Sequence, residues 1–419
     1  MVLTRAFTSS KSAFTSLLKP RNNVLAVSGD SRPDQMFYES ITPVPPAARG
    51  VAYHLRTLSK GRILVDDLYN FGTSGHTVSQ WYDNLGAVIA SGVGMCLIVI
   101  GTNSINNSTE TFATISTKIH DGVIAIRDAG IVPIVATDGP RTDWDATEAA
   151  LWHRVVNYVQ SLQSIRGVVI LDTLTSIVDT ASTVGVPIAG QLVDTVHWGP
   201  SLAFTLAKRL LPLIEAWFPA PFILPASSGD LYHATDNPYG SLVLNPLLTG
   251  DVSGVPTSWA GAASGTGIAL ASSKEADGSY LMDVSGTPST SLPSVMMSQA
   301  ITLGNLNDGD KVVAAVEFNI DAGFTGLVCP SVILDNAVTL TRVWGGAVVS
   351  GDNPIITDLD YSGVAISAVY THNAADPPAS LTMRFRPYFY NGAAALASIY
   401  VTRAAAFKVA SDYLAVPEW

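Results

Sequence analysis

The sequence predicts an α/β domain built on a doubly wound parallel sheet, followed by an all-β sandwich or jelly-roll domain. Three observations predict this arrangement. Between residues 24 and 218, short apolar runs alternate with longer amphipathic segments. A stretch rich in Pro and Gly at residues 217–230 then marks a change of composition. After about residue 236 the chain carries mainly short β-branched and aromatic runs, separated by Gly, Asn, Asp and Pro.

The apolar runs of the first half predict strands that are buried on both faces. Residues 109–129 and 146–164 repeat apolar side chains at intervals of three and four, which predicts helices, and a last helix is expected at 201–217. Strands that alternate with such helices form βαβ units, so we expect a flavodoxin-like sheet. The strand candidates, in chain order, are VLAVSGD, RILVDDLYNFG, MCLIVIGTN, VPIVATDG and VVILDT.

Two segments near the start of the chain need separate interpretation. Residues 1–22 form an N-terminal extension without the continuous apolar segment, about 7 to 15 residues long, of a secretory signal. The uncharged stretch 85–104 has the length of a membrane span, but glycines divide it and its apolar part is short. We interpret it as a helix end, a turn and a buried strand.

The second half predicts antiparallel strands, for example KVVAAVEFNI, LTMRFRPYFY and ASIYVTRAAAFKV. The predicted domains are therefore an α/β domain at 23–218, a linker at 219–235 and a β-sandwich at 236–419. No internal repeat is visible.

Composition excludes several classes of function. Hydrophobic residues make up 47% of the 419 residues and charged residues 14%, which is typical of packed sheets and not of a disordered chain. The formal net charge of −11 disfavours nucleic-acid and anionic-membrane partners. The two cysteines, Cys96 and Cys329, are expected to be buried packing residues and not a disulfide. No cofactor or zinc cluster is predicted.

Polar residues follow the predicted strands where ligands bind in open parallel sheets, at the carboxyl ends. The first strand ends in Gly-Asp-Ser at residues 29–31, the second in NFGTSG at 70–75 and the third in GTN at 101–103. The segment DTVH, residues 194–197, immediately precedes the last predicted helix. We expect these four segments to meet at one edge of the sheet.

Together these segments resemble the motifs of the SGNH, or GDSL, hydrolase family over residues 22–217. The resemblance implies a serine nucleophile at Ser31, with His197 and Asp194 completing the catalytic set. It assigns the oxyanion hole to the backbone N–H groups of Ser31 and Gly75 and to the side-chain amide of Asn103.

The residue types suit acyl transfer. A serine hydroxyl becomes nucleophilic only when a neighbouring base takes its proton, and neutral imidazole can accept that proton and return it to a leaving alkoxide. Asp194 lies three residues before His197 and can hold the ring in the required tautomer. The sequence therefore predicts a Ser31, His197 and Asp194 ester hydrolase.

Other interpretations of the same residues stay open. Ser31 fits a helix N-cap, Gly75 a turn, Asn103 an Asx-turn and His197 a plain surface histidine. A second DxxH segment occurs at residues 230–233, but it follows the last predicted helix where the family pattern places the pair before it. We favour the earlier pair.

Departures from the family pattern bear on the substrate. Ser104 stands where the family has an acid, which removes a carboxylate behind the oxyanion hole. Arg32, directly after the nucleophile, predicts a polar pocket wall; it is either a ligand for an acidic substrate group or, as we favour, a solvated or salt-bridged side chain. His76 and Trp198 are the other candidate substrate-binding residues, with a solvated loop histidine as the alternative for His76.

The start of the second half, residues 245–259, loosely resembles carbohydrate-binding jelly rolls. Aromatic side chains could stack on sugars, although core packing is the simpler interpretation. Residues 305–310 and 358–360 are rich in oxygen ligands, and hairpin turns explain them more simply than calcium sites. The aromatic candidates are Trp259, Trp344, Tyr388 and Tyr390.

These features predict a carbohydrate esterase that removes acetyl or other small acyl groups from a polysaccharide held by the β domain. The alternatives are a lipolytic or short-chain esterase, and a glycan-binding adhesion or phage-tail component with an auxiliary hydrolase domain. The domain type favours an extracellular or virion-associated location, although no signal peptide is visible. The sequence does not determine the oligomeric state, the acyl group or the sugar.

Overall fold

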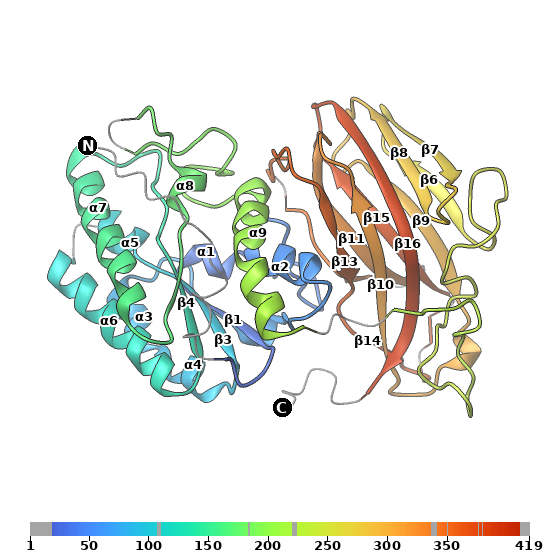
Figure 1. Cartoon of the computed structure of the whole chain (residues 1–419), viewed down its shortest axis with the longest axis horizontal. Coiled ribbons are helices and arrows are strands. Elements are labelled where there is room, and N and C mark those ends of the chain that lie inside the picture. Colours follow the sequence, from blue (N-terminus) through green and yellow to red (C-terminus); the bar gives the residue numbers. More distant parts are fainter. Residues whose placement is uncertain are drawn as a thin grey trace.

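The computed structural model describes residues 19–106, 110–182, 185–219, 224–336, 342–349, 351–375, 377–378 and 380–410. Most of the predicted N-terminal extension and part of the predicted linker, residues 220–223, lie outside these ranges. The chain forms two halves side by side: helices around a parallel sheet, coloured blue to green, and antiparallel strands, coloured yellow to red (Figure 1). The predicted limits of the two domains remain a prediction.

The first half contains a five-stranded parallel sheet in the order β2-β1-β3-β4-β5. This order confirms the doubly wound, flavodoxin-like fold. The second predicted strand is shorter than expected, because the Asp66 side chain accepts the N–H of Leu68 and closes a 3-10 turn ahead of it. The strands are β1 (Leu25–Gly29), β2 (Asn70–Gly72), β3 (Met95–Val99), β4 (Val132–Ala136) and β5 (Val169–Leu171).

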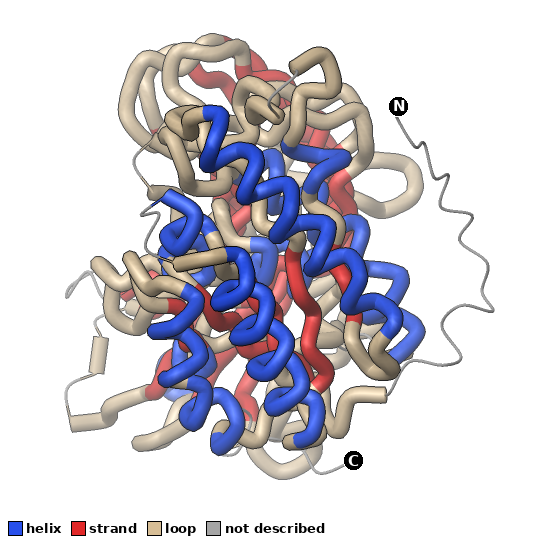
Figure 2. The backbone as a smooth tube through the Cα atoms, turned by 90° about the vertical axis from the view of Figure 1, so that its left-hand side faces the viewer, coloured by secondary structure: helices blue, strands red, loops and turns tan. Residues whose placement is uncertain are grey.

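Helices cover both faces of this sheet, and Figure 2 shows those on one face in front of the strands. The three predicted helices are confirmed as α6, α7 and α9, and the stretch 85–104 contains α4 and β3 as predicted. Within the described ranges no helix is long and apolar enough to cross a membrane. The helices are α1 (Ser31–Asp34), α2 (Val51–Leu58), α3 (Val78–Asp83), α4 (Leu85–Ala90), α5 (Thr102–Asn106), α6 (Phe112–Asp128), α7 (Ala146–Ser161), α8 (Leu174–Ile177) and α9 (Pro200–Trp217).

The two faces of the sheet belong to two different cores, as the period-two geometry of a strand requires. On β3, Leu97 faces α2 and α9, whereas Cys96 and Ile98 face α3, α6 and α7. Neither Cys96 nor Cys329 forms a disulfide and both are buried, which confirms their interpretation as packing residues.

The second half consists of two antiparallel sheets whose inner faces pack together, as in a β-sandwich. One has the order β13-β10-β16-β8-β7 with β14 beside β10, and the other β12-β11-β15-β9-β6. Phe318 on β10 stacks on Phe385 on β15, with ring centroids 5.5 Å apart. The strands are β6 (Ala260–Ser264), β7 (Ile268–Lys274), β8 (Tyr280–Gly286), β9 (Ser294–Ile301), β10 (Lys311–Ile320), β11 (Leu327–Asn336), β12 (Arg342–Trp344), β13 (Tyr361–Ile366), β14 (Tyr370–Thr371), β15 (Leu381–Phe389) and β16 (Ala395–Val409).

Several features expected of the second half can be compared with the structure. Trp259 and Tyr388 are buried, as core aromatics are. The Asp310 carboxylate accepts the N–H of Asn307 at 2.7 Å and pairs with Lys408, which fits a hairpin turn. The described residues contain no group of three or more His, Cys, Asp or Glu side chains that could hold a metal ion.

The two halves share a continuous apolar core in which α2 and α9 lie between the parallel sheet and the sandwich (Figure 1). Tyr361 on β13 contacts Phe204 on α9 and Phe318 on β10, with ring centroids 4.7 and 5.4 Å apart. Its hydroxyl lies 2.8 Å from Nδ1 of the fully buried His54. Tyr53 donates its hydroxyl to the carbonyl of Pro330 on β11. The second half therefore packs directly on the first.

Candidate active site

The first site element is the sharp junction between β1 and α1. Gly29 has a φ of 141°, and a Cβ there would lie 1.7 Å from the carbonyl oxygen of Val99 on β3, so only glycine fits. Asp30 caps α1 by accepting the N–H of Arg32 at 3.0 Å. The cap is thus Asp30, and Ser31 is the first helical residue, with a side chain free for another role.

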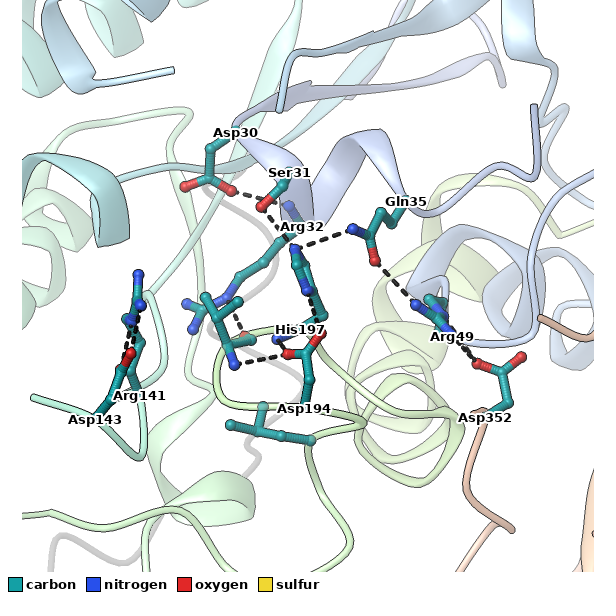
Figure 3. A network of polar contacts seen from close by, with 12 residues as sticks. Asp30, Ser31, Arg32, Gln35, Arg49, Arg141, Asp143, Asp194, His197 and Asp352 are labelled. Carbon is teal, nitrogen blue, oxygen red and sulfur yellow. Dashed lines mark hydrogen bonds and ion pairs between the residues drawn. The ribbon is translucent and has the colours of Figure 1, made fainter. Parts of the chain in front are cut away.

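Ser31 and the 194–197 segment meet beyond the end of β1 (Figure 3). His197 Nε2 lies 2.9 Å from Ser31 Oγ, and His197 Nδ1 lies 2.7 Å from Asp194 Oδ2. A carboxylate only accepts, so Nδ1 carries the proton and Nε2 presents its lone pair to the serine hydroxyl. These are the contacts that a serine nucleophile and its base require.

The other oxygen of Asp194 shapes the loop that carries the histidine. Asp194 Oδ1 accepts the backbone N–H groups of Val196 and His197 at 2.8 and 2.7 Å. Partial burial by itself would raise the pKa of Asp194, but the hydrogen bonds from His197 and Val196 outweigh it and lower the pKa. Asp194 therefore stays ionised beside the ring. The competing pair does not form: His233 contacts Asp236, and Asp230 contacts Asn237.

Gly75 and Asn103 follow β2 and β3, the two strands that flank β1. Gly75 is exposed with a φ of +83°, and no atom lies within 4 Å of a Cβ placed on it, so its backbone is open to a ligand. Asn103 donates from Nδ2 to the carbonyl of His76 at 3.0 Å, which ties the two loops together and leaves its second amide N–H. It does not form the alternative Asx-turn with its own segment.

Ser104 and Glu110 lie together at the start of α3. Ser104 Oγ accepts the N–H of Val78, and Glu110 accepts the N–H of Ser79, so together they hold the start of α3. Burial would raise the pKa of Glu110, but hydrogen bonds from Ser104 and Ser79 lower it overall. Glu110 thus places an ionised carboxylate beside Ser104.

Two of the candidate substrate-binding residues, Arg32 and Trp198, are buried. Arg32 is buried: its guanidinium pairs with Asp138 and also donates to the carbonyl of Val196 at 3.0 Å, so it braces the histidine loop and cannot reach a substrate. The favoured salt-bridged interpretation is confirmed. Trp198 is 3% exposed and packs in the core, below the Arg32 guanidinium. His76 is half-buried at the loop surface, and its contact with substrate stays a prediction.

Asp30 lies against this buried pair. Burial, reinforced by the Asp138 carboxylate, raises the pKa of Asp30 to about 7, although Arg32 opposes the shift. Its Oδ2 has no hydrogen-bond partner in the described part of the chain. The carboxyl group next to the nucleophile is therefore neutral in mildly acidic solution and ionises only as the pH approaches 7.

Three residues of the site have no motif that reveals them. Gln35 Nε2 lies 3.0 Å from His197 Nε2, and Arg49 donates to Gln35 Oε1 at 3.0 Å (Figure 3). Arg49 in turn pairs with Asp352, in the loop between β12 and β13. Only Gln35 carries a local signal, since it lies one turn after Ser31. A cavity of about 280 Å³ lies beside Gln35 and Arg49; its lining residues are Asp34, Gln35, Phe37, Tyr38, Glu39, Arg49 and Val349.

The fold and this constellation define an α/β protein with a hydrogen-bonded serine, histidine and aspartate at the carboxyl edge of its parallel sheet. No family model matches the sequence, and no curated protein matches it.

Solved structures do resemble it. They include a putative lipolytic protein of the G-D-S-L family from Desulfitobacterium hafniense (19% identity, 46% of this chain and 99% of that one, TM-score 0.37). A carbohydrate esterase family 3 structure from Talaromyces cellulolyticus (19% identity, 47% and 99%, TM-score 0.35) and a lipase/acylhydrolase from Enterococcus faecalis (16% identity, 48% and 99%, TM-score 0.37) are also similar. Similarity at this level does not transfer an activity, so the chemistry rests on the geometry of the site.

Proposed function

We propose that this protein is a serine ester hydrolase with Ser31 as nucleophile, His197 as general base and acid, and Asp194 as the group that orients the imidazole. The observation that carries the proposal is the unbroken chain from Ser31 Oγ to His197 Nε2 at 2.9 Å and from His197 Nδ1 to Asp194 Oδ2 at 2.7 Å. Short contacts of this kind place the base within reach of the proton that it must move.

The reaction proceeds in two halves. Ser31 Oγ attacks the ester carbonyl carbon while its proton passes to His197 Nε2, and the tetrahedral intermediate collapses when the leaving alcohol takes that proton. Water then attacks the acyl-serine, again with His197 as base, which releases the acid and restores Ser31. The N–H groups of Ser31 and Gly75 and the amide of Asn103 are the proposed donors to the oxyanion.

For the substrate we propose a small acyl ester of a carbohydrate. The cavity beside Gln35 supports this choice, because its lining combines two carboxylates, an amide and a guanidinium with the aromatic rings of Phe37 and Tyr38. Such groups suit a polyhydroxylated alcohol better than a long alkyl chain. Binding of the polysaccharide by the β half is part of the same proposal.

A fluorophosphonate probe followed by peptide mapping tests the nucleophile. We expect one adduct on the peptide that contains Ser31, and Ser31→Ala should lose both labelling and turnover while keeping its unfolding temperature. Ser161→Ala is the matched control, since that exposed hydroxyl donates to the carbonyl of Tyr158 within α7, away from the site. Labelling that survives in Ser31→Ala would refute the assignment.

The substrate is tested separately. Acetate release from acetylated xylan and acetylated monosaccharides is compared with hydrolysis of p-nitrophenyl palmitate. We expect short acyl groups on sugars to be hydrolysed preferentially. A strong preference for the long-chain ester would contradict the carbohydrate proposal and leave the serine hydrolase proposal intact.

A further inference from the structure

A line of polar contacts leads from the histidine of the site into the second half of the chain (Figure 3). Gln35 follows α1 and lies 3.0 Å from His197 Nε2. Arg49 precedes α2 and donates to Gln35 Oε1 at 3.0 Å. Asp352 belongs to the β12–β13 loop and receives Arg49 Nε at 2.8 Å and Arg49 Nη2 at 2.7 Å. We call Gln35, Arg49 and Asp352 the relay.

The far end of the relay is firmly fixed. The Asp352 side chain is fully buried, and its second oxygen accepts the N–H of Val349 at 2.7 Å. The Arg49 side chain is 10% exposed, and its Nε and Nη2 atoms both contact Oδ1 of Asp352. A buried, paired guanidinium has little freedom to leave its carboxylate, because either partner alone would be an uncompensated charge. Asp352 therefore sets the position of Arg49.

The relay also fixes which way the Gln35 amide points. Arginine has five N–H donors and no acceptor, so the atom of Gln35 that faces Arg49 must be the carbonyl oxygen. The NH2 group of Gln35 is then the one that faces His197 Nε2. The tautomer set by Asp194 leaves a lone pair on Nε2, so this NH2 donates to the ring at the nitrogen that also accepts the Ser31 hydroxyl.

We propose that Gln35 is a positioning residue that holds the ring of His197 in its neutral, proton-accepting form, and that the second half of the chain takes part in catalysis by fixing Gln35 through Arg49 and Asp352. This inference rests on the proposed function. When Nε2 gains a proton, its new N–H faces the NH2 of Gln35, and two donors oppose each other. The imidazolium is thus destabilised on the side where the leaving alcohol must collect its proton.

Other charges near the ring act in addition to the relay. Asp194 contacts Nδ1 and favours the imidazolium. The buried Arg32–Asp138 pair braces the loop from below through the carbonyl of Val196. The Arg141–Asp143 pair lies near Asp194, since the Asp194 charge acts on Asp143. None of these pairs is altered by substitutions in the relay, so a change of the relay isolates its own effect.

The test compares Gln35→Leu, Gln35→Glu and Asp352→Asn with the unaltered full chain. Two quantities are measured: the titration midpoint of the His197 ring by NMR, and the acid limb of the kcat/KM profile with p-nitrophenyl acetate. The NMR resonances are assigned by their loss in His197→Gln. Because the NMR midpoint needs no turnover, failure of the relay and failure of the hydrolase proposal give different results.

We expect Gln35→Leu to raise both quantities by about 0.5 to 1 pH unit, the shift that a hydrogen bond of ordinary net strength produces. Gln35→Glu places an acceptor beside the ring and should raise them further. In Asp352→Asn the amide NH2 faces the guanidinium, Arg49 is displaced, and a smaller shift in the same direction is expected. Unchanged midpoints in both Gln35→Leu and Asp352→Asn would overturn the relay.

Lys60→Gln is the control variant. It tests whether weakening any contact between the two halves changes the titration of His197. Lys60 pairs with Glu317 on β10 at 3.3 Å and so joins the two halves without belonging to the relay. We expect its profile and its NMR midpoint to match those of the unaltered protein. If Lys60→Gln shifts them as much as Asp352→Asn does, the effect comes from looser packing, and the relay is refuted. Should Asp352→Asn fail to fold, Arg49→Lys takes its place, because lysine can still pair with Asp352 but loses the fork that also reaches Gln35.

Discussion

Replacing Asp194 by Asn tests the hydrogen-bond chain with the smallest change of shape. Asp194 Oδ1 accepts two backbone N–H groups at 2.8 and 2.7 Å, so the remaining oxygen of Asn stays there and its NH2 takes the place of Oδ2, 2.7 Å from His197 Nδ1. The ring must then accept at Nδ1 and carry its proton on Nε2, which faces Ser31. In that tautomer Nε2 has no lone pair for the serine proton.

The size of the loss follows from the cost of restoring the productive tautomer. Turning the Asn amide around would leave both backbone N–H groups without an acceptor, at a cost of about 1 to 3 kcal/mol each. The barrier therefore rises by about 2 to 6 kcal/mol, and kcat falls by about 30-fold to 10⁴-fold.

The assay is kcat for p-nitrophenyl acetate at pH 8, with thermal unfolding measured in parallel. The unfolding temperature should change little, because Asn keeps the bonds that shape the loop and the Asp194 side chain is half exposed. Asp143→Asn is the matched control, since Asp143 pairs with Arg141 and has no hydrogen bond to the ring. A turnover of Asp194→Asn within tenfold of the unaltered protein would refute the tautomer argument.

Three further predictions follow from the same structure. Asn103→Ala should lower kcat by about 100- to 1000-fold with little change in KM, as loss of a hydrogen-bond donor to the oxyanion does. A fall in kcat of less than threefold in steady-state kinetics would exclude Asn103 as such a donor. The raised pKa of Asp30, about 7 against 3.8 in the unfolded chain, gives stability that is full below pH 3.8 and is lost as the pH rises toward 7. The free energy of unfolding in urea should therefore rise in Asp30→Asn, relative to the unaltered protein, by up to about 3 kcal/mol between pH 5 and pH 8. The same difference in stability between the two proteins at both pH values would contradict the raised pKa of Asp30. Gly346→Ala would place a Cβ 2.4 Å from the buried ring of Tyr53 and should lower the free energy of unfolding by about 1 to 3 kcal/mol in the same assay. Gly304→Ala is the control and should be nearly neutral, because no atom lies within 4 Å of the added Cβ. Equal effects of the two substitutions would argue against close packing of the two halves.

Local sequence patterns predicted most of the elements, and the family resemblance predicted the central contacts of the site. The run MCLIV is apolar at every position because β3 is buried on both faces, and the periodicity of residues 146–164 reflects the apolar face of α7. Ser31 was expected near other polar segments because it follows a strand of the parallel sheet, and the family resemblance paired it with His197.

The environment of each side chain could not be predicted in the same way. A salt bridge of Arg32 was the favoured interpretation, but its partner could not be named, because Asp138 follows β4 and lies more than a hundred positions along the chain. Trp198 adjoins the histidine in sequence but turns into the core. Arg49 and Asp352 belong to different halves, and no periodic pattern links them. Such pairings depend on tertiary packing, which single-residue propensities do not encode.

The insertion of α2 between the sheet and the sandwich limits how this chain can be divided or recombined. Every residue of α2 is buried, and the helix is joined to β11 and β13 by Tyr53 and His54. A truncated protein that ended after α9 would expose an apolar face of the kind that drives aggregation, and a foreign binding module joined at the same point would leave that face uncovered. Exchange of the β half between proteins would therefore need α2 to be exchanged with it. The segment that has to be transplanted is thus not the segment that follows the linker in the sequence.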